Sequence, residues 1–292
     1  MKQIIIFVLL ASLFSCNNSN EKADGYGNFE ATEVTISAEA NGKLEYLNLE
    51  EGDIIEPNTL VGLVDTIQLH LNKQQLIASK ATVYSKSENV LSQISVLQAQ
   101  LKTTLMEQKR IQNMFAENAA TKRQVDEIEG KVDVIKEQMK GVQTLNAPII
   151  NEIASIDVQI RKINDQIKNS KIINPIKATV LAKYAEPNEI ASFGKPLYKI
   201  ANLSQMTLRV YVSETQLPKI KLNQKVTVKI DNGTGMKSYP GTISWISSVA
   251  EFTPKIIQTK EERVNLVYAV KVDVKNDGAL KIGMPAEMWI VH

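Results

Sequence analysis

The sequence predicts an α+β multidomain protein, in which a long antiparallel α-helical coiled-coil hairpin is inserted in a split β-sandwich and followed by a small β-barrel. Three observations predict this fold. Residues 66–171 carry a seven-residue apolar period, similar strand–turn–strand segments flank them, and apolar residues alternate with polar ones from residue 206 onward. With 292 residues, 43% of them hydrophobic, the chain is long enough for two or three domains.

The charge balance excludes one broad class of function. The chain has 34 basic and 32 acidic residues, and only 5% of its residues are aromatic. Nucleic-acid binding usually needs a basic face, and single strands also need aromatic side chains for stacking. We therefore expect no nucleic-acid partner.

The N-terminus predicts export from the cytoplasm. Lys2 precedes the apolar run IIIFVLLASLFS, which is too short to span a bilayer core of about 30 Å. Residues 1–15 are therefore predicted to be a lipoprotein signal peptide, because LFSC resembles a bacterial lipobox. Lipid attachment at Cys16, the only cysteine, would leave residues 16–32 as a flexible tether. An ordinary secretory signal with an incidental cysteine is the alternative.

Residues 66–171 are predicted to form the helical hairpin. The second arm holds a complete heptad pattern, formed by Val125, Val132, Met139, Asn146, Ile153, Ile160 and Ile167 and, three residues after each, by Ile128, Ile135, Val142, Ile149, Ile156 and Ile163. The first arm keeps the period less strictly, with Leu69, Leu76, Val83, Val90, Leu97 and Ile111 in one row and Ile94, Leu101 and Phe115 in the other. Each arm would extend roughly 75 Å. A helical bundle folded on itself is the alternative.

Two local features shape the second arm. The connection at residues 116–124 is short enough to force an antiparallel return, and Thr121 can cap the second helix. Further along, Pro148 and the core-position residue Asn146 mark a kink or a break. We expect two stacked helical segments in this arm.

The split sandwich is predicted from residues 33–65 and 172–205. Aligned without a gap, the two segments place similar residues at equivalent positions, namely Asp53 with Glu189, Ile54 with Ile190, Asn58 with Gly194, Val61 with Leu197 and Val64 with Ile200. A pair of lone strands cannot bury a core. The two halves are therefore expected to close into one body around the base of the hairpin.

Residues 206–292 are predicted to form the β-barrel. Five segments alternate in the manner of strands: TLRVYVSE, KVTVKIDN, GTISWISSVA, LVYAVKVDVKN and AEMWIVH. A short helix is expected at ETQLPKIK, where Pro218 keeps it brief. Five to six strands and one helix suit a small barrel.

These features together resemble the HlyD-type periplasmic adaptor subunits, or membrane fusion proteins, of bacterial tripartite exporters. The first half of the sandwich carries Gly42 and the turn Glu51-Gly52-Asp53, and the second half carries Pro175, with Ala178 where the family usually has glycine. The resemblance implies a biotinyl/lipoyl-like sandwich. Its turns hold no attachment lysine, so a carrier role and a covalent cofactor are not expected.

No arrangement of residues predicts catalysis or a metal site. The two histidines, His70 and His292, have no second ligand at helical or turn spacing, and no nucleophile triad, phosphate-binding loop or metalloprotease helix occurs. The protein is therefore predicted not to be an enzyme and to hold neither cofactor nor metal.

Two segments have the best claim to function through the resemblance. Arg110, Met114 and Thr121 match, in spacing, the hairpin-tip residues by which efflux adaptors meet an outer-membrane channel. The alternative is a solvated Arg110, with Met114 and Phe115 closing the hairpin core. A second segment resembles a signature of adaptors linked to ABC transporters, and consists of Phe252, Thr253, Pro254, Lys255, Gln258, Thr259, Glu261, Glu262 and Arg263. A charged surface loop supporting the barrel is the alternative there.

The resemblance implies a lipid-anchored periplasmic adaptor, preferably on the inner membrane. It would link an inner-membrane export pump, ABC type first, to an outer-membrane TolC-like channel for efflux or secretion, in a ring of commonly six copies. Three alternatives stay open: an adaptor of a proton-driven RND pump, an envelope scaffold lipoprotein without a transport role, and a lysine-acylated carrier.

Overall fold

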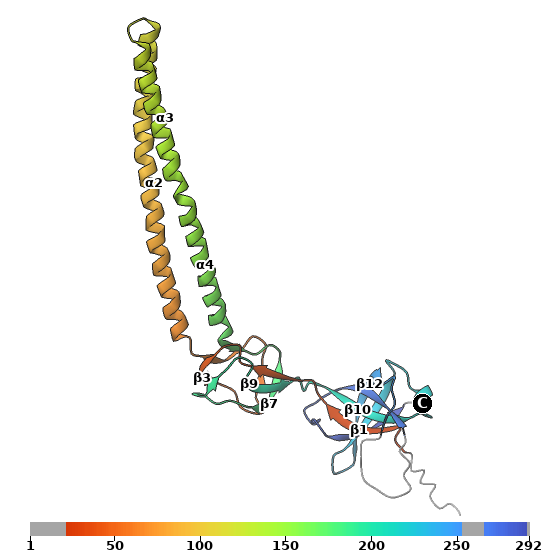
Figure 1. The fold of residues 1–292 in the computed structure, drawn as a ribbon. Coiled ribbons are helices and arrows are strands. Elements are labelled where there is room, and N and C mark those ends of the chain that lie inside the picture. Colours follow the sequence, from red (N-terminus) through yellow and green to blue (C-terminus); the bar gives the residue numbers. More distant parts are fainter. Residues whose placement is uncertain (1–21, 253–265, 291–292) are drawn as a thin grey trace, which may run out of the picture.

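The computed structural model describes residues 22–252 and 266–290. These residues form a helical hairpin, a β-sandwich at its base and a β-barrel beyond the sandwich (Figure 1). The predicted signal peptide, Cys16 and His292 lie outside the described residues. None of the described helices combines the length and hydropathy needed to cross a membrane.

The hairpin consists of α2 (Ile67–Ala116), α3 (Lys122–Thr144) and α4 (Asn146–Asn169). Every predicted heptad position of the second arm is buried or half-buried, whereas most residues between these positions are exposed. The packing follows this seam, since α2 contacts both α3 and α4. Figure 1 shows the hairpin projecting away from the β domains, so the alternative of a bundle folded on itself is wrong.

The second arm is broken where the sequence predicted a kink or a break. Leu145 links the two helices with φ −70° and ψ −18°, so the chain keeps its direction through the junction. Pro148 lies in the first turn of α4, where a missing backbone N–H leaves no helical hydrogen bond unmade.

The sandwich contains two four-stranded sheets. One has the order β2-β9-β7-β4 and the other β6-β5-β3-β8. The strands before the hairpin are β2 (Glu33–Ser37), β3 (Gly42–Leu47), β4 (Ile54–Ile55) and β5 (Leu60–Val64). Those after it are β6 (Lys171–Ile173), β7 (Ala178–Lys183), β8 (Ile190–Ala191) and β9 (Pro196–Ala201). Each sheet combines strands from both groups, and Leu47 and Leu197 belong to one core, so the predicted halves do close into a single body.

The barrel is a closed ring of six antiparallel strands. Its members are β1 (Gly25–Glu30), β10 (Gln205–Ser213), β11 (Lys225–Asp231), β12 (Met236–Ile246), β14 (Leu266–Lys275) and β15 (Pro285–Ile290), and the pairing of β10 with β14 closes the ring. A short strand, β13 (Glu251–Phe252), pairs with the start of β14. The expected helix is a three-residue 3₁₀ turn, η1 (Leu217–Lys219).

The prediction of a flexible tether over residues 16–32 is wrong for its second half. Strand β1 pairs with β10 on one side and β15 on the other, and Phe29 is fully buried in the barrel core. Gly27 belongs here because a Cβ would lie 1.8 Å from the carbonyl oxygen of Arg209. In the sequence Gly27 looks like a residue of a flexible linker. In the structure it is required because β1 and β10 approach each other closely at this position.

Candidate functional site at the hairpin tip

The hairpin turns through a compact loop whose backbone hydrogen bonds are satisfied. Asn118 adopts φ 60° just after the end of α2, a left-handed conformation that asparagine tolerates. Its N–H donates to the carbonyl of Phe115 (3.0 Å), and the Ala119 N–H donates to the carbonyl of Met114 (2.8 Å). This is the Schellman arrangement for ending a helix, so the tip is a defined structure.

Thr121 starts the second arm through a reciprocal cap. Its hydroxyl oxygen accepts from the backbone N–H of Gln124, and the Gln124 side-chain oxygen accepts from the Thr121 backbone N–H at 2.7 Å. The predicted capping role of Thr121 is therefore confirmed. Its side chain is exposed but already engaged with Gln124.

Arg110 and Met114 lie one turn apart on the last two turns of α2. The Arg110 guanidinium donates to Glu107 at 2.7 Å, and its side chain remains 69% exposed. Met114 and Phe115 are both exposed. The predicted seam position of Phe115 is thus wrong, because α3 begins only at Lys122 and the seam does not extend to the tip. Met114 and Phe115 therefore do not close the hairpin core.

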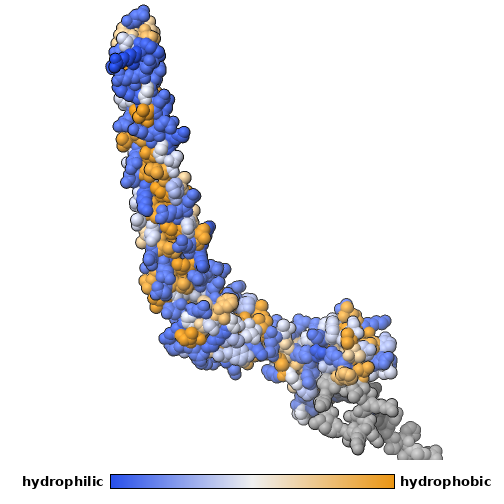
Figure 2. All heavy atoms as spheres, in the orientation of Figure 1, coloured by the Kyte–Doolittle hydropathy of each residue, from blue (hydrophilic) through white to orange (hydrophobic). Residues whose placement is uncertain are grey.

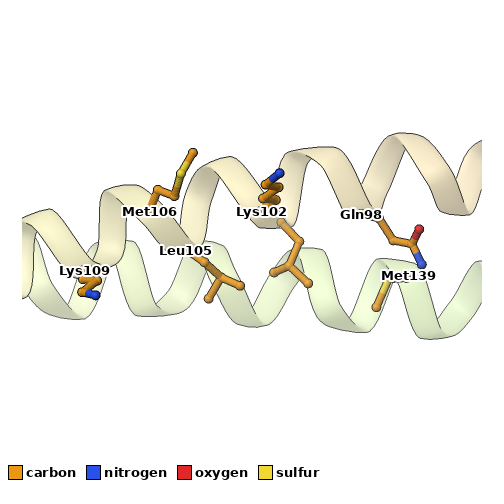
Figure 3. A pocket seen from close by; sticks show the side chains of 7 residues that line it. Gln98, Lys102, Leu105, Met106, Lys109 and Met139 are labelled. Carbon is orange, nitrogen blue, oxygen red and sulfur yellow. The ribbon is translucent and has the colours of Figure 1, made fainter.

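A shallow depression lies on the distal half of the hairpin. Figure 3 shows Leu105 pointing across the second helix, whereas Met106 points away from it. The lining residues are Gln98, Leu101, Lys102, Leu105, Met106, Lys109 and Met139. Leu105 and Met106 lie outside both heptad rows of the first arm, so the seam pattern does not predict them. The available signal for Leu105 was an exposed apolar row at seven-residue spacing, formed by Ile77, Tyr84, Leu91 and Leu105 and interrupted by Gln98. Met106 is not part of this row.

Two lysines in or beside the sandwich turns are ion-paired, Lys177 with Glu56 and Lys195 with Glu189. Lys183, at the end of β7, has a side chain only 9% exposed, and its ammonium donates to Glu186 (2.9 Å) and Glu50 (3.1 Å). These carboxylates, Glu186 first, raise the pKa of Lys183. The ion pairs hold this lysine against the sandwich and do not present it for attachment of a cofactor.

In residues 22–252 and 266–290, no group of three or more His, Cys, Asp or Glu side chains is placed to hold a metal ion. The ring of His70, on the exposed first turn of α2, lies 2.9 Å from the carbonyl of Thr66. Of the predicted signature loop, only Phe252 lies within the described residues, and it is exposed on β13.

Solved structures and curated proteins share this architecture. The membrane fusion protein Spr0693 of Streptococcus pneumoniae R6 aligns with a TM-score of 0.53 over 91% of this chain and 97% of its own, at 15% identity. The chain has the fold of the membrane fusion proteins. MacA of Actinobacillus actinomycetemcomitans aligns with a TM-score of 0.54 over 90% of this chain and 76% of its own, at 20% identity.

Sequence comparisons agree with this membrane fusion protein fold. Residues 206–290 match the YknX-like beta-barrel domain. A UPF0194 membrane protein of Yersinia enterocolitica is 26% identical, with 99% of this chain and 97% of the relative aligned. Another, from Acidithiobacillus ferridurans, is 25% identical over 91% of this chain and 86% of its own. The likeness to the UPF0194 proteins thus spans hairpin, sandwich and barrel.

Proposed function

We propose that this protein is a non-catalytic periplasmic adaptor that links an inner-membrane export pump to an outer-membrane channel. The observation that carries the proposal is the free-standing hairpin rising from a sandwich whose sheets both combine strands from before and after it. Such a rod, held together by its own heptad seam, reaches far from the barrel. Its work would be to span and seal, while the pump supplies the energy.

The anchor in this proposal is lipid at Cys16, preferably in the inner membrane. The short apolar segment before Cys16 and the lipobox-like LFSC support it. The names of the UPF0194 relatives, which are called membrane proteins, agree with a membrane location. Copies of the adaptor would stand side by side in a ring, commonly of six.

The tip of the hairpin is the proposed contact with the channel. Arg110 keeps most of its side chain exposed, so it can exchange Glu107 for a carboxylate or a backbone carbonyl of a partner helix. Met114 offers an adaptable apolar side chain one turn further along. Thr121 lies at the start of the returning arm, and its hydroxyl would contact the channel only in addition to its capping role.

An ABC-type pump is the proposed inner-membrane partner. The support is the resemblance of the segment that begins at Phe252 and ends at Arg263 to adaptors of that class. Residues 253–263 would face the pump. An RND pump is the second candidate, and copurification in mild detergent separates them, because an ABC pump brings an ATPase with it. Copurification of neither pump would favour an envelope scaffold.

Crosslinking tests the tip directly. A photoreactive residue in place of Met114 should capture an outer-membrane channel protein in intact cells. The matched control is Met106, a more exposed methionine on the same helix, about 12 Å nearer the base at 1.5 Å per residue. Equal capture from both positions, or none from position 114, would contradict end-on contact.

A further inference from the structure

We propose that the end of the barrel where the chain enters β1 lies on the lipid surface, contacting it through Val249, Phe252 and Leu266. These three residues are named the apolar rim below. The proposal rests on the proposed function in one respect, the lipid anchor at Cys16. It adds a second membrane contact, made by the folded barrel itself.

The first described residues are fixed to one end of the barrel by three hydrogen bonds that Asp24 makes. Its backbone N–H donates to the Met288 carbonyl (2.9 Å), and its carboxylate accepts from the Ile290 N–H (2.8 Å). Its carbonyl accepts from the side-chain amide of Gln216 (2.8 Å). The first described residues therefore have a defined position on the barrel.

The apolar rim lies at that same end. The Gln216 side chain that holds Asp24 also accepts from the backbone N–H of Ser213 (2.9 Å). Ser213 pairs in register with Val267 of β14, the residue directly after Leu266. On the other side of β14, Leu266 pairs with Phe252. Val249 joins them through Ser247, whose N–H donates to the Ala269 carbonyl of β14 (2.8 Å) and whose hydroxyl donates to the Val249 carbonyl (2.8 Å). A short series of contacts thus connects the start of β1 to the rim.

The rim side chains are large, apolar and exposed to solvent. Val249 is 70% exposed, Phe252 72% and Leu266 54%. Leu266 lies two residues before Tyr268, which packs against the barrel core, so both are on the core-facing side of β14. The alternation of core-facing side chains along β14 therefore continues to Leu266, beyond the end of the barrel core.

The short segment between Cys16 and Asp24 favours the lipid surface as the partner of the apolar rim. Asp24 follows Cys16 by eight positions, and at no more than about 3.6 Å per position the two lie less than about 30 Å apart. A barrel end on so short a tether stays next to the bilayer. Tyr26, exposed on β1 at the same end, adds an aromatic ring with a polar hydroxyl, and such rings are enriched at membrane interfaces.

The rim and the lipid would together orient the molecule. A single tether holds the barrel near the membrane but lets it rotate. Burial of the rim in the headgroup region, typically to a depth of about 5–10 Å, would fix which end faces the lipid. In Figure 1 the hairpin rises from the sandwich while the barrel extends sideways from it, and Figure 2 shows apolar patches on the barrel surface. A barrel end on the lipid therefore leaves the hairpin free for its partner.

Fluorescence quenching by lipid tests the proposal on the full lipidated chain. Because Cys16 is the only cysteine, Phe252→Cys provides a unique thiol for an environment-sensitive dye once Cys16 carries lipid. The control is Phe193→Cys, at an equally exposed phenylalanine (76%) on the sandwich. The vesicles contain phosphatidylethanolamine, phosphatidylglycerol and a phospholipid with a spin label on its headgroup.

We expect at least about twofold stronger quenching at position 252 than at position 193, because only the rim enters the headgroup region. Leu266→Cys should follow position 252. Equal quenching at 252 and 193 would overturn the lipid contact, as would shielding of position 252 that appears only when a pump is added. Unchanged circular dichroism and thermal midpoint would show that the variants are folded.

The same samples separate the two proposals. In the unsubstituted chain, a dye that reacts with Cys16 would show a free thiol, which would overturn both the anchor and the rim contact. A blocked Cys16 with no difference between positions 252 and 193 would overturn the rim contact alone and leave the adaptor proposal intact.

Discussion

Ser87 of α2 and Asn146 of α4 meet across the hairpin, with the Ser87 hydroxyl donating to the Asn146 side-chain oxygen at 2.8 Å. Ser87 is buried, and Asn146 occupies a core position of the heptad pattern. The pair lies at the level where the second arm breaks. A polar layer therefore crosses the apolar seam at the junction of α3 and α4. Such a pair can fix the register of the two arms.

The first prediction concerns this polar layer. Ser87→Ala should lower the free energy of unfolding of the hairpin by about 1 kcal/mol, because the amide of Asn146 loses its partner in a half-buried position. Combining Ser87→Ala with Asn146→Leu should recover that loss, since no polar group then remains unpaired. Denaturant unfolding followed by circular dichroism measures both. Ser92→Ala, at an exposed serine of α2, should not destabilise the hairpin, and an equal loss there would contradict the role of Ser87.

The second prediction compares two valines of α3. Val132 is 2% exposed and lies in the seam, whereas Val134 is 56% exposed. Val132→Ala should cost about 2 kcal/mol of unfolding free energy, through lost burial and the cavity left behind. Val134→Ala should be neutral within about 0.5 kcal/mol. Similar losses for the two variants would show that the seam does not stabilise the hairpin.

The third prediction concerns two glycines with opposite surroundings. Gly27→Ala should disrupt the barrel, at a cost of about 3 kcal/mol or more, because the new Cβ would collide with the backbone of Arg209. Gly130→Ala on α3 should instead stabilise the hairpin by about 1 kcal/mol, since nothing lies within 4 Å of the new methyl group. Thermal unfolding of the two variants shows the difference in sign. A harmless Gly27→Ala would argue against β1 as a barrel strand.

The fourth prediction concerns the pH dependence of the barrel. The Asp277 carboxylate accepts from the Lys237 ammonium at 2.6 Å and from the Tyr239 hydroxyl at 3.1 Å. The bond from Lys237, with one from the Ala279 N–H, lowers the pKa of Asp277 from 3.8 to about 2. A lowered carboxyl pKa stabilises the folded state above the ordinary value, and this contribution is lost as the pH falls from 3.8 through about 2.

Asp277→Asn should therefore lower the thermal midpoint at neutral pH, and the difference from the unsubstituted protein should vanish near the bottom of that range. The same ion pair raises the pKa of Lys237, so its contribution is complete below pH 10.5 and is lost progressively as the pH rises above that value. Thermal scans across pH measure this profile. Asp133→Asn, at a carboxylate 3.7 Å from Lys136 on the hairpin surface, is the control and should leave the pH profile almost unchanged.

Some features of the tip could be predicted from local sequence. The cap at Thr121 depends on a hydroxyl three residues before a glutamine, and such local spacing is visible in the chain. The exposure of Phe115 could not be predicted in this way. Its place in the apolar row suggested packing, but the returning helix starts too late to cover it. Burial of Phe115 depends on where the opposite helix begins, and the apolar row of α2 does not specify that position.

The sequence by itself determined the hairpin seam, the break near Pro148 and the alternating strands of the barrel, because periodicity and proline act over a few residues. Only the tertiary structure decided three further points: that β1 belongs to the barrel, that Ser87 is the partner of Asn146, and that an apolar rim borders the chain entry. Each of these joins residues far apart along the chain. Such contacts depend on which distant segments the folded backbone brings together. The identity of one residue does not predict which residue will be its partner.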